Sequence, residues 1–173
     1  MDAEKLRDYI RDIPDFPKPG ILFRDVTPLF LVPEALRAAA DALAAPFQDA
    51  RVDRVLGIEA RGFLLGAPVA LALGAGLGLV RKEGKLPYQT HQVSYDLEYG
   101  SDAVEMHVDT VEKGHRVLIL DDLIATGGTA AASIRLAREA GGDVVGCSFL
   151  IELSDLAGRR LLDVETIHSV IRY

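Results

Sequence analysis

Apolar positions follow two patterns along this chain. One predicts strands and the other predicts helices. Short runs dominated by apolar residues are typical of strands that are buried on both faces. Such runs occur at residues 54–58, 76–82, 116–122 and 144–153. Apolar residues at helical spacing predict helices at residues 33–47, 62–73 and 129–141. Strands that alternate with helices favour an α/β fold, with a mainly parallel sheet flanked by helices.

Further segments depart from this simple alternation. Residues 4–13 have apolar positions at helical spacing, which predict a short N-terminal helix. Residues 103–110 alternate in polarity, which predicts a half-exposed strand with Glu105 and His107 on its solvated face. Residues 84–100 are long, polar and without a clear period. Such a segment is often a lid over a binding site, and an ordered surface excursion is the alternative.

Composition and charge exclude several functional classes. The chain has 173 residues, of which 49% are hydrophobic, so we expect one domain with a substantial core over residues 1–173. Its net charge of −7 disfavours nucleic acid and anionic membranes as partners. The sequence has no apolar run that could span a bilayer, and its charged N-terminus lacks the apolar core of a signal peptide. The single cysteine, Cys147, fits a reducing environment, so we expect a cytoplasmic location.

The stretch VLILDDLIATGGT, residues 117–129, carries the clearest candidate chemistry. It ends in a Thr-Gly-Gly-Thr turn that follows a predicted strand and opens a predicted helix. Glycines let the backbone approach a ligand, while threonine hydroxyls and the helix N-terminus favour a phosphate group. The turn lacks the Gly-Lys-Ser/Thr sequence of a Walker A loop. Taken alone, it could equally be an ordinary glycine-rich connection between a strand and a helix.

Asp121 and Asp122 indicate what lies beside that phosphate. Two adjacent carboxylates at the end of a buried strand are costly to desolvate unless they meet hydrogen-bond donors or a cation. The two hydroxyls of a ribose are suitable donors, and a ribose 5-phosphate carries a diol and a phosphate close together. The acid pair therefore favours a sugar phosphate over an isolated phosphate.

Local basic residues could bind a further anionic group in this acidic chain. The segment Arg81–Lys85 holds three of the 19 Lys and Arg residues within five positions, which suits a polyanion. A solvated basic loop is the more common role of such a run. Arg61 follows the predicted strand at residues 54–58 within an otherwise apolar segment, which argues against a plain surface role.

The stretch at residues 117–129 resembles the signature of the type I phosphoribosyltransferases, which bind phosphoribosyl pyrophosphate. Other blocks resemble members of this family that use adenine, in an order and spacing that cover nearly the whole chain; they are DFPKPGILFRDVTPLF, GIEARGFLLGAPVA, VRKEGKLP, YDLEYG and FLIELSDLAGR. The resemblance implies a type I phosphoribosyltransferase-like fold. It also implies an N-terminal helix and hood segment at residues 1–32 and a flexible catalytic loop at residues 81–100.

The resemblance further implies a role for each candidate residue. The ribose hydroxyls would contact Asp121 and Asp122. The 5-phosphate would be held by Ala125, Thr126, Gly127, Gly128 and Thr129. The pyrophosphate would be bound by Arg61, Lys82 and Lys85, beside a cis peptide bond at Glu59–Ala60. The adenine ring would contact Leu22, Phe23, Arg24 and Leu153. Catalysis would involve Arg61, Glu98 and Tyr99, with Glu98 handling the proton at N7 of the purine.

The implied reaction joins adenine to phosphoribosyl pyrophosphate in the presence of Mg²⁺ and yields AMP and diphosphate, as a step of purine salvage. The metal would be held mainly through the substrate and water, with Asp121 and Asp122 as candidate direct ligands. The resemblance also implies a homodimer. Two alternatives stay open, namely a 6-oxopurine enzyme acting on xanthine, hypoxanthine or guanine, and a non-catalytic sensor of phosphoribosyl pyrophosphate. The presence of Arg61, Lys82 and Glu98 favours a working enzyme over a sensor.

Overall fold

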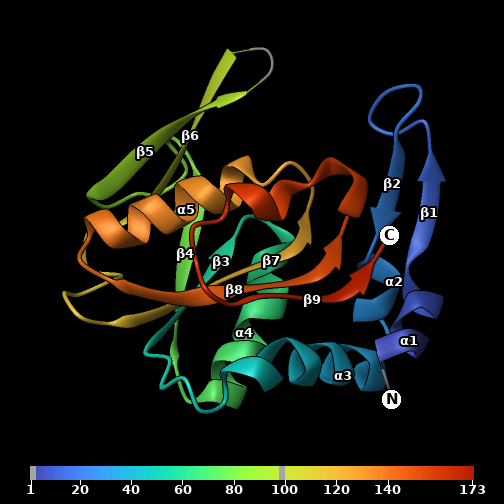
Figure 1. The fold of residues 1–173 in the computed structure, drawn as a ribbon, viewed down its shortest axis with the longest axis horizontal. Helices are drawn as coiled ribbons and strands as arrows, with labels where there is room; N and C mark the ends of the chain where they lie inside the picture. Colours follow the sequence, from blue (N-terminus) through green and yellow to red (C-terminus); the bar gives the residue numbers. More distant parts are fainter. Residues whose placement is uncertain (1–2, 98–99) are drawn as a thin grey trace.

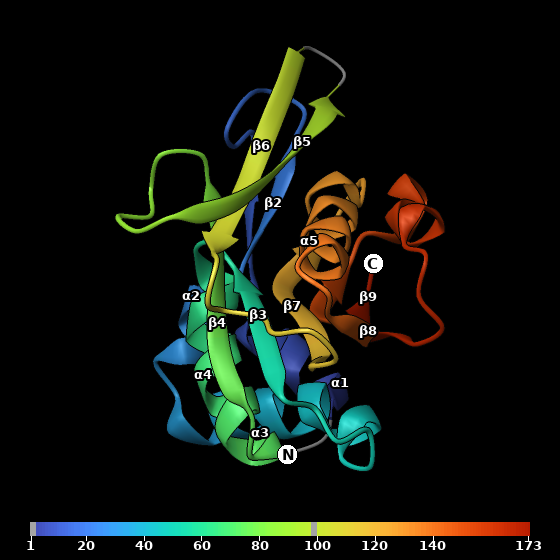
Figure 2. The same ribbon diagram turned by 90° about the vertical axis from the view of Figure 1, so that its left-hand side faces the viewer.

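The computed structural model describes residues 3–97 and 100–173, and Figures 1 and 2 show their arrangement. Within these ranges, seven strands form one mixed sheet in the order β5-β6-β4-β3-β7-β8-β9. The parallel part of the sheet consists of β4 (Gly76–Lys82), β3 (Arg54–Ile58), β7 (Arg116–Ile124), β8 (Asp143–Glu152) and β9 (Ile167–Arg172). Two antiparallel strands extend it beyond β4, namely β6 (Gly100–His107) and β5 (Thr90–Leu97). The prediction of an α/β fold with a mainly parallel sheet is confirmed.

Helices cover both faces of this sheet. The helices α3 (Pro33–Ala44) and α4 (Arg61–Leu73) lie on one face, and α5 (Gly128–Glu139) lies on the other (Figure 2). Each face of the sheet has its own hydrophobic core, and successive residues of β3 pack into one core and then the other. Val55 packs toward α3 and α4, while Leu56 packs toward α5. The strands are therefore apolar on both faces, which is why the sequence shows them as unbroken apolar runs. In the part of the chain described here, no helix is long and apolar enough to cross a membrane.

The N-terminal segment differs from the predicted helix at residues 4–13. The helix α1 (Ala3–Leu6) and the 3-10 turn η1 (Arg7–Tyr9) are short, and β1 (Arg11–Pro14) follows them. This strand pairs antiparallel with β2 (Leu22–Asp25), and the Arg11 guanidinium meets the Asp25 carboxylate at 2.6 Å. Pairing across the hairpin thus overrides the helical spacing of the sequence. The hairpin rises beside the sheet (Figure 1), and α2 (Thr27–Phe30) connects it toward α3.

The segment predicted to be irregular, residues 84–100, is strand in its second half. Here β5 pairs with β6 along its whole length, from Thr90 opposite His107 to Leu97 opposite Gly100. The resulting hairpin projects above the rest of the sheet (Figure 2). Because β5 pairs with β6 and carries polar residues, its sequence shows no clear alternation of apolar and polar positions. The prediction of irregular structure is therefore wrong for this half.

Glu105 on β6 is buried, which contradicts the prediction of a solvated polar face. Only 5% of this residue is exposed. One carboxylate oxygen accepts the backbone N–H groups of Lys85 and Leu86, each at 3.0 Å, and the other accepts the hydroxyl of Thr90 at 3.4 Å. The connection before β5 folds back over β6 and covers this face. Glu105 therefore anchors the base of the hairpin.

Candidate active site

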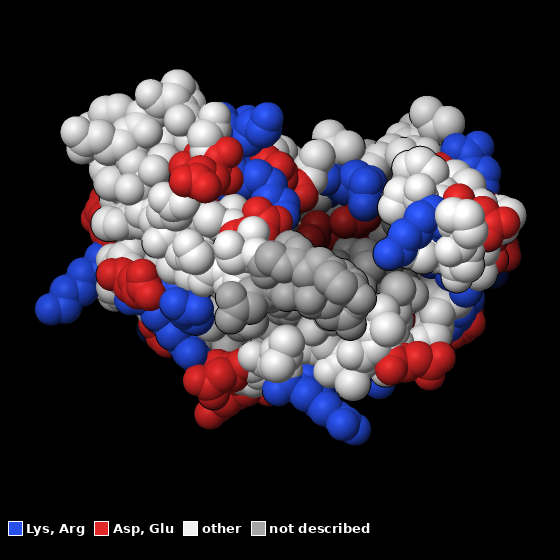
Figure 3. All heavy atoms as spheres, turned by 90° about the horizontal axis from the view of Figure 1, so that it is seen from above, with Lys and Arg blue, Asp and Glu red and all other residues white. Residues whose placement is uncertain are grey.

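Three neighbouring parallel strands bring the candidate residues to one edge of the sheet. The chain turns into Glu59 and Arg61 directly after β3, β4 ends at Lys82, and β7 carries Asp121 and Asp122 near its end. Figure 3 looks onto this edge and shows acidic side chains deep in a hollow with basic side chains around it. Ligands of α/β proteins bind in crevices at the carboxyl ends of parallel strands, so this hollow is the candidate active site.

The loop at residues 125–129 forms a small cradle between β7 and α5. Gly127 has a left-handed backbone with φ of 85°, and a Cβ atom at this position would lie 2.3 Å from the carbonyl oxygen of Gly158. The loop and the end of β7 enclose a pocket of about 120 Å³. Because α5 begins at Gly128, its N-terminal N–H groups and partial positive charge face this pocket. Space and charge both suit a phosphate group.

The C-terminal part of the chain braces this cradle. Leu153 donates its N–H to the carbonyl of Ile124 at 3.0 Å, and the turns η3 (Ser154–Leu156) and η4 (Gly158–Leu161) follow it. Arg159 donates to both carboxylate oxygens of Glu152, at 2.9 and 3.1 Å. Burial alone would raise the pKa of Glu152, but the hydrogen bonds of Arg159 and the charges of Arg159 and Arg172 outweigh burial and lower it. Glu152 therefore stays ionised and holds η4 against the cradle.

The two aspartates of β7 have different partners. Asp122 is 5% exposed, and its Oδ2 accepts a hydrogen bond from Nε of Arg61 at 2.5 Å. Asp121 accepts the N–H of Asp122 through Oδ1 at 2.8 Å. Burial raises the pKa of Asp121 well above its usual value, and the neighbouring Asp122 carboxylate raises it further. Among residues 3–97 and 100–173, Arg61 forms its ion pair with Asp122 and lowers the pKa of Asp121 only through its charge. A ligand that donates hydrogen bonds or carries positive charge would therefore stabilise the ionised form of Asp121.

Arg61 connects the acid pair with the N-terminal hairpin. It begins α4, and the peptide bond at Glu59–Ala60 is cis, as predicted. Its guanidinium carbon lies 5.4 Å from the centre of the Phe23 ring on β2, within the range of a cation–π contact. The structure therefore brings Phe23 next to the candidate site.

The other residues expected to bind a base differ in exposure and in the partners of their side chains. The Leu22 side chain is 45% exposed, and Leu153 is half-buried beside the end of β7. The Arg24 guanidinium pairs with Asp12 and lies 3.8 Å from the centre of the Tyr173 ring. The Arg24 side chain thus contacts Tyr173 and Asp12, so only the main chain of Arg24 is left to form hydrogen bonds with a base.

Of the three basic residues in the segment 81–85, the structure brings Lys82 to the site. Lys82 donates to the hydroxyl of Tyr95 at 3.2 Å and forms an ion pair with Asp102. Arg81 instead pairs with Glu59 at 2.9 Å. Lys85 is exposed, and within residues 3–97 and 100–173 we find no hydrogen bond or ion pair of its ammonium group.

Tyr95 and Asp102 lie in the site although sequence reasoning missed them. Both belong to the β5–β6 hairpin, which the sequence pattern did not reveal. The block YDLEYG does contain Tyr95, but the resemblance directed attention to its Glu-Tyr pair. Those two residues, Glu98 and Tyr99, lie outside the described residues, so their roles stay predictions.

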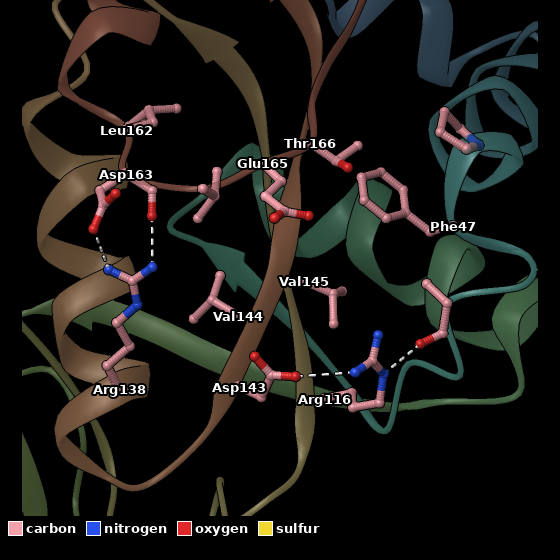
Figure 4. Close-up of a pocket in the computed structure, with 13 residues that line it drawn as sticks. Phe47, Arg116, Arg138, Asp143, Val144, Val145, Leu162, Asp163, Glu165 and Thr166 are labelled. Atoms are coloured by element: carbon pink, nitrogen blue, oxygen red, sulfur yellow. Dashed lines mark hydrogen bonds and ion pairs between the residues drawn. The ribbon is translucent and has the colours of Figure 1, made fainter.

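A larger cavity, of about 740 Å³, lies at the opposite end of the strands (Figure 4). Its two guanidinium groups already have partners within the protein. Arg116 donates to Asp143 at 2.9 Å and to the carbonyl of Ala50 at 2.6 Å, and Arg138 donates to the Asp163 carboxylate at 3.0 Å. The candidate residues do not meet there, so this cavity is not the candidate active site.

Comparisons with known proteins agree with this location. The family model for the phosphoribosyl transferase domain matches residues 29–169, which include the acid pair and the cradle. The chain belongs to the phosphoribosyltransferase family. Among curated relatives of this phosphoribosyltransferase, the adenine phosphoribosyltransferase of Thermobifida fusca is 58% identical over 166 residues, which are 95% of this chain and 94% of the relative.

Solved structures resemble the whole chain. The crystal structure of adenine phosphoribosyltransferase from Rhodothermus marinus has a TM-score of 0.94 at 56% identity and covers 99% of this chain and 98% of its own. The adenine phosphoribosyltransferase of Saccharomyces cerevisiae, solved in complex with an imino-altritol bisphosphate and adenine, has a TM-score of 0.92 at 38% identity. It covers 97% of each chain.

Proposed function

We propose that this phosphoribosyltransferase transfers the phosphoribosyl group of phosphoribosyl pyrophosphate to adenine, forming AMP and diphosphate, and so serves purine salvage. The observation that carries this proposal is the meeting of the phosphate cradle, the Asp121–Asp122 pair and Lys82 at one edge of the sheet. Adenine is proposed as the base because the relatives above are adenine phosphoribosyltransferases, one of them solved with adenine.

In this proposal the sugar phosphate lies between the acid pair and the cradle. The 5-phosphate accepts hydrogen bonds from the backbone N–H groups and hydroxyls of residues 125–129, helped by the N-terminal charge of α5. The ribose hydroxyls donate to Asp121 and Asp122. Asp121 then gains a second donor beside the N–H of Asp122, while Asp122 keeps its contact with Arg61.

The leaving group lies on the other side of the sugar. Arg61 and Lys82 neutralise charge that builds up on the pyrophosphate as its bond to carbon 1 breaks. Carbon 1 becomes cationic in this step, and the two carboxylates of β7 place negative charge near it. Lys85 contributes only if its exposed side chain turns toward the site.

The base would bind under the N-terminal hairpin. Phe23 on β2 and Leu153 supply apolar surface, and the main chain of Leu22 and Arg24 supplies hydrogen-bonding groups at the edge of the ring. We also propose that residues 1–173 act as one domain, in which residues 1–32 form the helix and hood that cover the base.

Residues 81–100 are proposed to close over the bound substrates and exclude water, which would otherwise hydrolyse the activated sugar. Glu98 would take or hold the proton at N7 while N9 attacks carbon 1, and Tyr99 would complete the closed loop. Replacing Glu98→Gln should then lower kcat about a hundredfold or more. Glu83→Gln, at an exposed glutamate of the same segment, is the matched control; equal turnover of the two variants would refute the role of Glu98.

Mg²⁺ is the proposed cofactor. Carboxylate oxygens suit this ion, and we find no ion pair of Asp121 among the described residues, so the acid pair fits a nearby divalent cation. Among the described residues, no group of three or more His, Cys, Asp or Glu side chains could hold a metal, so the substrate and water would supply most of its ligands. When bound, the ion would neutralise pyrophosphate oxygens.

The proposed setting is a cytoplasmic homodimer with no nucleic acid or membrane partner. The buried, unpaired thiol of Cys147 suits a reducing compartment. Leu64 and Leu71 lie seven positions apart on α4, and are 55% and 84% exposed. They form an apolar stripe that a second copy of the chain could cover.

Base selectivity tests the proposed function. Steady-state turnover would be measured with phosphoribosyl pyrophosphate and Mg²⁺ while adenine, hypoxanthine, guanine and xanthine are offered separately. We expect strong turnover with adenine alone. Turnover with a 6-oxopurine instead would keep the sugar-phosphate site and overturn the base assignment, and binding of phosphoribosyl pyrophosphate without turnover of any base would indicate a sensor.

A further inference from the structure

The hydroxyl of Tyr95 lies at the centre of a polar network that joins both ends of the proposed substrate site. It lies 3.2 Å from Nζ of Lys82, 3.2 Å from Oδ2 of Asp102 and 3.1 Å from Oγ1 of Thr129. Lys82 ends β4, and Thr129 stands in the first turn of α5. Elements that are separate in the sequence thus meet at one oxygen atom.

The hydrogen-bonding capacity of this hydroxyl is fully used. A phenol has one proton to donate and can accept two hydrogen bonds. Tyr95 donates to the Asp102 carboxylate and accepts from the Lys82 ammonium group. The Thr129 hydroxyl is the third partner at 3.1 Å, and either oxygen can donate in this contact, which keeps the Thr129 side chain next to Tyr95.

Packing fixes the ring as well as the hydroxyl. Tyr95 is 9% exposed, and its ring lies so close to α5 that a Cβ atom at Gly128 would be 3.4 Å from Cδ2. The ring is thus held against the N-terminus of the helix that forms the cradle. A buried ring with three hydrogen-bond partners has little freedom to move its hydroxyl.

We propose that Tyr95 is a positioning residue for phosphoribosyl pyrophosphate. Its hydroxyl holds Lys82, assigned to the pyrophosphate, at a fixed spacing from Thr129, assigned to the 5-phosphate. Both assignments belong to the proposed function, so this inference rests on it. Without the hydroxyl, Lys82 keeps its ion pair with Asp102 and its contact with the ring at position 95, but its link to Thr129 is lost. The substrate must then order Lys82 and Thr129 relative to each other.

The test replaces Tyr95→Phe, which keeps the packed ring and removes only the hydroxyl. We expect KM for phosphoribosyl pyrophosphate to rise about tenfold, as for the loss of a hydrogen bond to a charged group, while KM for adenine and the melting temperature stay close to wild type. Tyr88→Phe is the matched control. Tyr88 is 58% exposed on the same segment, and its hydroxyl makes no hydrogen bond within the described residues.

The outcomes separate this inference from the proposed function. If wild-type protein turns over no base, the proposed function fails. If wild type is active and Tyr95→Phe has an unchanged KM for phosphoribosyl pyrophosphate, Tyr95 does not position this substrate. If both KM values rise and the melting temperature falls together, Tyr95 only stabilises the hairpin, and the proposal is overturned.

Discussion

At the scale of single residues, Asp121 and Asp122 differ in how they affect the stability of the fold and the binding of a ligand. Asp122 is paired with Arg61 and contributes to the fold through that contact. Asp121 has no ion pair within residues 3–97 and 100–173, and its raised pKa means that folding disfavours its ionised form. Groups of this kind are retained where a ligand needs them.

Replacing Asp121→Asn should therefore raise the melting temperature at pH 7, because the amide removes a disfavoured buried charge but can still accept the N–H of Asp122. The gain should vanish below the ordinary aspartate value of 3.8, where Asp121 is protonated in both the folded and the unfolded state. Thermal unfolding across this pH range checks the prediction, and a lower melting temperature at pH 7 would contradict it.

Asp122→Asn is the matched variant and should lower the melting temperature, because Arg61 loses its charged partner. The two substitutions together should weaken phosphoribosyl pyrophosphate binding at least about tenfold, since each removes a charged acceptor for a ribose hydroxyl. Calorimetric titration measures this affinity. Unchanged binding by the double variant would show that the ribose does not contact the acid pair.

At the scale of elements, burial decides what could be predicted from the sequence. The strands β3 and β4 match the predicted residues 54–58 and 76–82, because strands covered on both faces leave unbroken apolar runs. The strand predicted at residues 103–110 overlaps β6 (Gly100–His107), but its pairing with β5 and the whole β1–β2 hairpin were missed. These pairings depend on partners that no local pattern reveals.

The residues of the candidate site also fall into those that the sequence predicted and those that it did not. The cradle and the acid pair lie within one short motif, so local sequence was sufficient to predict them. Tyr95 and Asp102 reach Lys82 only because the β5–β6 hairpin folds over the end of β4. Likewise, Glu105 has the polarity of a solvated residue and is buried by a connection that folds back onto its strand.

The cradle depends on a single backbone conformation at Gly127. Gly127→Ala should weaken phosphoribosyl pyrophosphate binding more than tenfold, because the new Cβ would clash with the Gly158 carbonyl and displace the loop. Gly114→Ala is the control, since its φ of 87° imposes the same strain, about 1–2 kcal/mol, in open space. Equal binding by the two variants would refute a clash-dependent effect.

At the level of the whole molecule, the proposed homodimer would cover the apolar face of α4 that carries Leu64 and Leu71. Leu71→Glu should give a monomer, because it places a charge in the proposed interface. Leu161→Glu, at a residue that is 59% exposed on η4, should leave the dimer intact. Sedimentation velocity distinguishes the two masses, and dimers for both variants would exclude this face.

We infer that this one edge of the sheet exchanges pyrophosphate for adenine on a ribose 5-phosphate. The experiment is ³¹P NMR of the wild-type protein, residues 1–173, mixed with adenine, phosphoribosyl pyrophosphate and Mg²⁺. We expect the substrate signals to be replaced by those of AMP and free diphosphate in equal amounts, and only when adenine is present. Release of diphosphate with ribose 5-phosphate instead of AMP, or no change at all, would contradict it.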